Sequence, residues 1–391
     1  MEKEYSTRSI LFSLIQSELS NKKFDNERLK NLSSEKLEKL YELAKAHDVV
    51  HLIAFALDKQ KMLTQDEISQ KYQKQIMLAI FRYEKIDYEQ KRISEILENN
   101  EIKFILLKGA VIRKFYPEPW MRTSCDIDVL VHQEDIDKAI SVLKDAGFTQ
   151  EISNTKYDYT LNSPSGIHLE LHYSLDRHDS ILMAEPVLDK VWDECRLQEG
   201  KKNEHYMSNE MFLFYHIVHL AKHFSIGGCG IRPLIDLWLL TKNLEFNNEK
   251  LYSFFLQTKL LVFYEACVQL SKVWMEDAPH TDITYRMEQF ILTGGVYGNV
   301  SNAVLVQAAK GESKIGSFFK LVFLPKEKLE KVYPNLKKHP ILLPFYQVKR
   351  WFKLFNKKKR NNAKSIIKER NNVSVEQKKE TEDLLNQLGL L

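Results

Sequence analysis

Lys108-Gly109-Ala110 opens the stretch that decides the expected fold, and after a short interval comes Arg122-Thr123-Ser124-Cys125-Asp126-Ile127-Asp128-Val129-Leu130-Val131. Successive side chains on a strand point to opposite faces, so Asp126 and Asp128 share one face while the apolar residues enter the core. Two carboxylates on one face suit Mg²⁺, which prefers hard oxygen ligands. Such a pair is also compatible with a solvated strand edge. Because the apolar run draws the strand inward and the two acids would repel each other without a cation, we expect a metal site here.

The glycine turn ahead of the acids has the features of a phosphate-binding turn. Gly109 has no Cβ and lets the backbone approach a ligand closely, and the helix expected over 109–115 offers free amides to phosphate oxygens. Ala110 has no hydroxyl, so Lys108, Ser124 or backbone amides would supply the phosphate contacts. A simple chain turn with a solvated lysine is the alternative. Arg122 is either a surface residue or, because it lies close to the acids, a phosphate or carboxylate partner.

Further strands are expected at 103–107, 126–132, 157–161 and 167–173, with an amphipathic helix over 134–146. The last two strands flank the turn-forming sequence Asn162-Ser163-Pro164-Ser165-Gly166 and predict an antiparallel hairpin. In the second of them Glu170 lies on a polar face with two histidines. If that face shares a sheet with the acidic pair, Glu170 becomes a third carboxylate that binds metal or acts as a general base. Asp158 is the alternative base.

A second group of polar residues lies downstream. His216, His219 and His223 recur at spacings of three and four, and a glycine-rich loop, Arg232 and Asp236 follow. The histidines share one helical face. They indicate a zinc site, hydrogen-bonded interior histidines or the lining of a substrate site. Arg232 and Asp236 are one helical turn apart, so they also suit a local ion pair.

The pattern along the chain predicts an α+β protein, with a small mixed β-sheet core flanked by N- and C-terminal helical regions. The expected regions are helical residues 1–98, the sheet core 99–175, helical residues 176–343, and a basic amphipathic helix with a mobile tail at 344–391. The tail stripe contains Phe345, Val348, Phe352 and Phe355, with Lys353 and Lys357 to Arg360 beside it. Such a segment suits an anionic lipid surface, an acidic partner or the protein's own helices.

Composition narrows the class of protein. The chain has 391 residues, 44% of them hydrophobic, and it shows neither a signal-peptide pattern nor a long apolar run, so we expect a cytoplasmic location. Its four cysteines form no Cys-x-x-Cys pair. Residues 344–391 carry 12 Lys and Arg against 5 Asp and Glu, which accounts for more than the whole net charge of +4. The remaining chain has no excess of positive charge that would attract nucleic acid, so a small-molecule partner is favoured.

These motifs resemble the DNA polymerase β-like nucleotidyltransferases, in particular a bacterial group of uncharacterised nucleotidyltransferases; toxin and abortive-infection nucleotidyltransferases look similar around the same turn. The resemblance rests on Leu107 to Ala110, Arg122, the Asp126 and Asp128 strand, and Leu169-Glu170-Leu171. It implies transfer of a nucleoside monophosphate from a nucleoside triphosphate, with Mg²⁺ or Mn²⁺, to a hydroxyl or phosphate acceptor such as a small molecule or a peptide or glycan precursor.

Residue roles follow from the same resemblance. The catalytic and metal-binding residues would be Asp126, Asp128 and Glu170. The nucleotide-binding residues would be Lys108, Gly109, Ala110, Arg122 and Ser124, and the substrate-lining residues His219, His223, Arg232 and Asp236. Three other functions stay open at this point: a toxin-like enzyme that modifies tRNA, a non-catalytic nucleotide-binding module, and a membrane-associated scaffold.

Overall fold

A computed structural model describes residues 6–20, 32–151, 158–175, 183–295, 300–311, 323–324, 326, 329–330, 333, 335–352 and 373–391. The N-terminal helices are α1 (Thr7–Leu19), α2 (Ser34–Ala46), α3 (Val50–Lys59) and α4 (Glu67–Asn99). The middle of the chain adds α5 (Gly109–Ile112), α6 (Ile136–Asp145) and α7 (Glu185–Leu188), with short 3-10 turns η2 (Arg113–Phe115), η3 (Pro119–Met121), η4 (Gln133–Asp135) and η5 (Asp189–Trp192). The C-terminal helices are α8 (Asn209–Phe224), α9 (Arg232–Asn243), α10 (Asn248–Gln257), α11 (Leu261–Glu276), α12 (Asp282–Leu292), α13 (Val300–Ala309), α16 (Asn335–Lys338), α17 (Leu343–Phe352) and α19 (Val375–Gln387), with η6 (Pro340–Leu342) between α16 and α17.

Seven strands form one mixed sheet, which confirms the expected α+β class. They are β1 (Phe104–Leu106), β2 (Asp126–Val131), β3 (Thr149–Gln150), β4 (Asp158–Asn162), β5 (His168–His172), β6 (Cys195–Leu197) and β7 (Glu204–Met207), in the spatial order β3-β4-β5-β2-β1-β7-β6. The β4–β5 hairpin is antiparallel, as the turn sequence predicts. The central strand β2 runs antiparallel to β1 and parallel to β5. Strands β3, β6 and β7 were not expected, because each is only two to four residues long.

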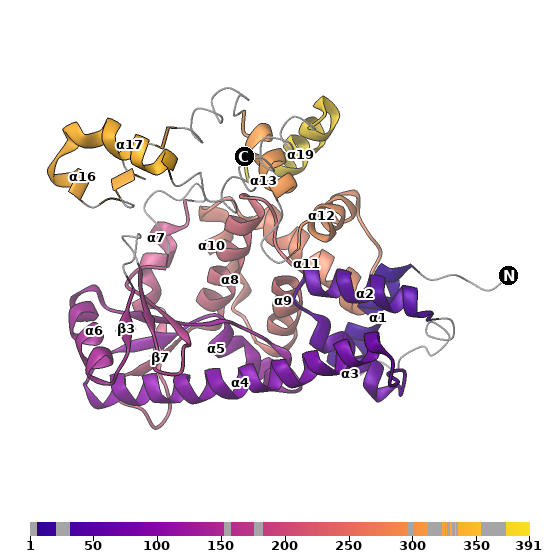
Figure 1. The fold of residues 1–391 in the computed structure, drawn as a ribbon, viewed down its shortest axis with the longest axis horizontal. Coiled ribbons are helices and arrows are strands. Elements are labelled where there is room, and N and C mark those ends of the chain that lie inside the picture. Colours follow the sequence, from indigo (N-terminus) through magenta and orange to yellow (C-terminus); the bar gives the residue numbers. More distant parts are fainter. Residues whose placement is uncertain are drawn as a thin grey trace.

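The two faces of the sheet are covered differently. The odd-numbered side chains of β2 and two leucines of β5 pack against α6 and the C-terminal half of α4, in a cluster that includes Ile127, Val129, Val131, Leu169 and Leu171. Leu130 on the opposite face joins a larger cluster with α8, α9 and α11. Figure 1 shows α4 running along one side of the molecule beneath the sheet and the central helices. The alternation in β2 therefore turns its acids toward the face that α8, α9 and α11 cover.

Helices from both ends of the chain share one core. Phe12 of α1 stacks on Trp274 of α11 with ring centroids 4.7 Å apart. Leu384 and Leu385 of α19 and Leu388 just after it are also buried in this cluster. The N-terminal and C-terminal helical regions thus support the same side of the sheet. The domain limits at residues 98, 175 and 343 stay a prediction.

The segment α16–α17 lies apart from the main body in Figure 1. It has a small core of Leu329, Tyr333 and Leu336, while Phe345 and Val348 are exposed. The predicted stripe residue Phe355 and the basic run from Lys357 to Arg360 lie outside the described residues. Among the described helices, none has both the length and the apolar character needed to cross a bilayer.

Candidate active site

Three carboxylates of the neighbouring strands β2 and β5 line one cavity of about 370 Å³. The parallel pairing of β2 with β5 places Asp128 opposite Glu170 and Asp126 opposite His168. Residues opposite each other on neighbouring strands project to the same side of a sheet. Asp126, Asp128 and Glu170 accordingly all line the cavity.

Asp128 is the most deeply buried of these acids, with 3% of its surface exposed. Its Oδ1 accepts a hydrogen bond from Lys108 Nζ at 2.7 Å and lies 2.9 Å from His172 Nε2. Burial alone would raise the pKa of Asp128, but Lys108 and His172 hold that pKa below its usual range. Burial would likewise lower the pKa of Lys108, whereas Tyr215 and Asp128 raise it. The buried acid and its lysine are therefore both charged.

Asp126 has a different electrostatic environment. Burial and the nearby charge of Asp128 raise the pKa of Asp126, with a smaller contribution from Glu170 in the same direction. A divalent cation would offset this crowding of negative charge. The donor set, two carboxylates on β2 and one on β5, has the oxygen chemistry that Mg²⁺ or Mn²⁺ takes. The alternative base, Asp158, is on β4 and pairs with His172 of β5, so it lies one strand further from Asp128. The side chain of Asp158 is outside the described part of the structure.

The glycine turn joins the same cavity through Lys108, Gly109 and Ser124. Lys108 has φ +45°, a backbone conformation that is uncommon for residues other than glycine. A Cβ on Gly109 would lie 2.9 Å from Arg122 Nη1 and 3.3 Å from Ser124 Cβ. A larger residue at this position would therefore have to displace the Arg122 guanidinium and crowd Ser124. The Ala110 amide donates to the Leu107 carbonyl at 3.2 Å and closes the turn.

Arg113, which was not predicted as a site residue, stabilises the glycine turn by hydrogen bonds. Its Nε donates to the Gly109 carbonyl at 2.8 Å, and its Nη2 donates to Ser124 Oγ at 3.0 Å. The residue is buried. Because Ser124 Oγ accepts from Arg113, the hydroxyl proton of Ser124 remains available for a ligand oxygen.

The arginines make pairs different from the expected one. Arg122 Nη2 donates to Asp236 Oδ2 at 2.9 Å, and Tyr116 donates to Oδ1 of the same carboxylate at 2.8 Å. Arg232 instead donates to Asp48 Oδ2 at 2.8 Å. The expected ion pair between Arg232 and Asp236 is therefore wrong. Asp236 is buried on the side of α9 that faces the glycine turn, where Arg122 contacts it. Each arginine ties a helix of the C-terminal region to another part of the chain.

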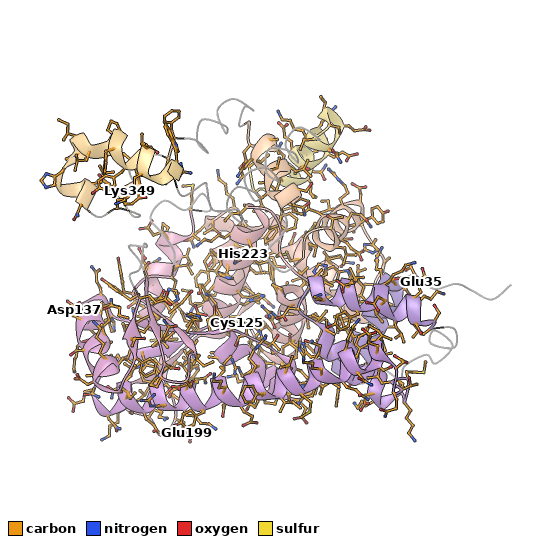
Figure 2. All side chains as sticks on the ribbon, in the orientation of Figure 1. Glu35, Cys125, Asp137, Glu199, His223 and Lys349 are labelled. Atoms are coloured by element: carbon orange, nitrogen blue, oxygen red, sulfur yellow. The ribbon has the colours of Figure 1, made fainter. Side chains whose placement is uncertain are left out.

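The three histidines of α8 line the opposite wall of the cavity. His219 and His223 approach each other with their Nε2 atoms 3.1 Å apart, and His216 Nε2 lies 2.8 Å from the Pro233 carbonyl oxygen. Burial lowers the pKa of all three. In the described part of the chain, the group of three potential metal ligands is Asp128, Glu170 and His172, and it contains none of these α8 histidines. Figure 2 labels His223 and Cys125, another cavity residue, near the centre of the body.

A comparison with protein-family models matches residues 33–276 to a family described as uncharacterised nucleotidyltransferase. The chain belongs to this family. A search of curated proteins gave no match. Two solved structures of ANT(2'')-Ia were found, an antibiotic-resistance factor in solution and a crystal complex with adenylyl-2''-tobramycin. Both are 12% identical with a TM-score of 0.33; the matches cover 43% of this chain and 88% of the first structure, and 44% of this chain and 95% of the second.

The matched range of this nucleotidyltransferase runs from α2 to the end of α11. It contains every residue that lines the cavity, from His47 to Asp236. The sequence analysis missed His47 and Asp48, which follow α2 and close the cavity from the N-terminal side. No local motif marks them, since Asp48 reaches the site through hydrogen bonds from Arg232 of α9 and Thr123 of the η3–β2 loop.

Proposed function

We propose that this nucleotidyltransferase moves a nucleoside monophosphate from a nucleoside triphosphate to a hydroxyl or phosphate of a small acceptor, with a divalent cation, Mg²⁺ or Mn²⁺. The observation that carries the proposal is the convergence of Asp126, Asp128 and Glu170 with the Lys108–Gly109 turn on one cavity. A cavity of about 370 Å³ falls within the size range of small-molecule sites. Because nucleoside triphosphates would be its substrates, we place the enzyme in the cytoplasm.

Each residue has a stated role in the proposed reaction. Asp126, Asp128 and Glu170 would hold the cation, which when bound neutralises the triphosphate and the leaving oxygen. Lys108 and the Ser124 hydroxyl would bind phosphate oxygens, with Arg122 and Ala110 shaping the turn. The acceptor oxygen forms a bond to the α-phosphorus, the bond between that phosphorus and the bridging oxygen breaks, and pyrophosphate leaves. The acceptor proton passes to Glu170, whose side chain is 36% exposed.

The acceptor would lie against the α8 and α9 wall. His219 and His223 are held neutral by burial, and neutral imidazoles both donate and accept hydrogen bonds. Arg232 and Asp236 are held in ion pairs with Asp48 and Arg122 and would orient this wall. These groups suit a polar, uncharged portion of an acceptor.

The test uses nucleoside triphosphates labelled at the α- or the γ-phosphate, incubated with the full chain, Mg²⁺ and fractionated cell extract. We expect label from the α-phosphate to become attached to a small acceptor molecule, whereas label from the γ-phosphate should leave in pyrophosphate. Labelling of tRNA would support the toxin-like alternative. Triphosphate binding without any transfer in any fraction would contradict the enzymatic proposal and favour a nucleotide-binding module.

We also propose that the α16–α17 segment contacts an anionic lipid surface. Ile341, Phe345 and Val348 are exposed, and Lys349 and Arg350 follow on α17. Exposed apolar residues beside basic ones are typical of interfacial helices. Flotation with vesicles containing phosphatidylglycerol should carry the chain, whereas Phe345→Ser with Val348→Ser should stay behind. Equal flotation of both, or none of the wild type, would contradict this role.

A further inference from the structure

His172 is the last residue of β5 and lies close to two of the proposed metal-binding acids, Asp128 on β2 and Glu170 on β5. Its Nε2 lies 2.9 Å from Asp128 Oδ1 and 3.5 Å from Glu170 Oε2. The side chain is 13% exposed and lies beside Asp128 and Glu170, which line the cavity. One donor atom from each of Asp128, Glu170 and His172 lies within 4.8 Å of the other two.

These spacings are those of ligands that share one ion. In an octahedral site with ligands about 2.1 Å from the cation, neighbouring ligands lie about 3 Å apart. The separations from His172 Nε2 to the two carboxylate oxygens bracket that value. A hydrogen bond between the imidazole and Asp128 explains the shorter of these two distances but not the longer one. Three donor atoms within 4.8 Å of one another can all reach one cation placed among them.

The chemistry of the third donor sets the choice of metal. Mg²⁺ takes oxygen ligands and keeps several waters, whereas imidazole nitrogen suits first-row transition ions. We propose that His172 is a direct nitrogen ligand of the divalent cation in this site, and that it shifts the preference of the site from Mg²⁺ toward Mn²⁺. This inference rests on the proposed function, because it names the cation environment of the same site.

Lys108 is compatible with this arrangement. Its ammonium contacts the same Oδ1 of Asp128 that His172 approaches. A carboxylate has two oxygens with about four lone-pair positions, so Asp128 has capacity for an ammonium and a cation together. Lys108 also lies at the glycine turn, so its Nζ has a second partner once a triphosphate is bound.

The experiment measures Mn²⁺ alone bound to the full chain, by electron paramagnetic resonance for affinity and by pulsed methods that detect ¹⁴N coupling to Mn²⁺. The wild type should bind Mn²⁺ about tenfold or more tightly than Mg²⁺ in competition, and its spectrum should show nitrogen coupling. His172→Gln should lose the coupling and most of the preference for Mn²⁺. His168→Gln is the matched control, because His168 lies on the same face of β5 but is exposed and opposite Asp126. That variant should behave like the wild type.

Histidine labelled with ¹⁵N in the wild type guards against a His172→Gln chain that fails to fold. Replacement of the ¹⁴N coupling by the ¹⁵N pattern then identifies a histidine ligand without any substitution. Mn²⁺ binding with no nitrogen coupling, or coupling that persists in folded His172→Gln, would overturn the inference and leave the proposed function standing. Failure of the wild type to bind either ion would overturn both.

Discussion

Gly109 shows at the scale of one residue how the phosphate-binding turn depends on packing. An added Cβ would meet Arg122 Nη1 at 2.9 Å and Ser124 Cβ at 3.3 Å. We expect Gly109→Ala to displace both side chains, to cost about 1 to 3 kcal/mol of stability and to weaken triphosphate binding measured by calorimetry. Gly200→Ala is the control, since that glycine has φ +75° and no atom near its absent Cβ. The control should lose stability but keep its triphosphate affinity; equal affinity in folded Gly109→Ala would contradict this reading of the turn.

Glu170 is the second residue whose role is open to a direct test. It lies in register with Asp128, whereas Asp158 lies one strand away. We expect Glu170→Gln to lower the rate of α-phosphate transfer by about 100-fold or more, because a general base of this kind contributes on that scale. Asp158→Asn should change the rate little. A reversed result would assign the base to Asp158.

At the scale of elements, the pair of Arg122 and Asp236 fastens α9 to the loop before β2. The side chains are 10% and 1% exposed, and Tyr116 adds a second donor to the same carboxylate. Removing one member of a buried pair leaves an uncompensated charge, so Asp236→Ala should cost about 3 to 5 kcal/mol in denaturant unfolding. Arg122→Met with Asp236→Leu should cost less than the sum of the two single changes. Strict additivity in that cycle would mean the pair is not coupled.

Elements with strong periodicity were predictable from the sequence. The alternation of Ile127, Asp128 and Val129 fixes which residues of β2 face α4 and α6 and which face the cavity, and the Pro164–Gly166 turn predicts the β4–β5 hairpin. Strands β6 and β7 were not predictable, because Arg196 and Glu204 break the apolar pattern and the strands are held by pairing with β1 and each other.

At the scale of the whole molecule, the cavity is assembled from four stretches of the chain, 47–48, 108–128, residue 170 and 216–236. Lys108 and the acids could be predicted, since each stands in a local pattern, a glycine turn or an alternating strand. The contribution of Asp48 could not, because its partners Arg232 and Thr123 lie far away in the sequence and meet it only in the folded chain. The same is true of the partner of Asp236: spacing along α9 favours Arg232, but the folded chain brings Arg122 to it.

Buried histidines should make the folded chain sensitive to mild acid. Burial lowers the pKa of His47 to about 4, and it lowers the pKa of His51 and the three α8 histidines. The unfolded state binds these protons first, so stability should fall as the pH drops below about 6.5, toward 4. His172, whose pKa is raised by Asp128 and Glu170 against the effect of burial, opposes this trend.

The contribution of His47 is measurable from the slope of melting temperature against pH. His47 is fully buried, and its share of the acid loss is at most about 3 kcal/mol at pH 4. His47→Gln should flatten the slope between pH 6.5 and 4.5 whatever its effect on stability at pH 7.5. An unchanged slope in the variant would show that His47 does not remain neutral in the folded chain.

The most direct test of the account is the gain in triphosphate affinity that Mg²⁺ provides, measured by titration calorimetry with each of the four triphosphates. The wild type should bind one or more triphosphates tightly with Mg²⁺ and weakly with a chelator. Asp126→Asn and Asp128→Asn, folded by circular dichroism, should lose that gain, while Asp137→Asn on the outer edge of the body should keep it (Figure 2). Absence of metal-dependent binding in the wild type, or the same gain in both site variants, would contradict the assignment of this cavity as a metal–triphosphate site.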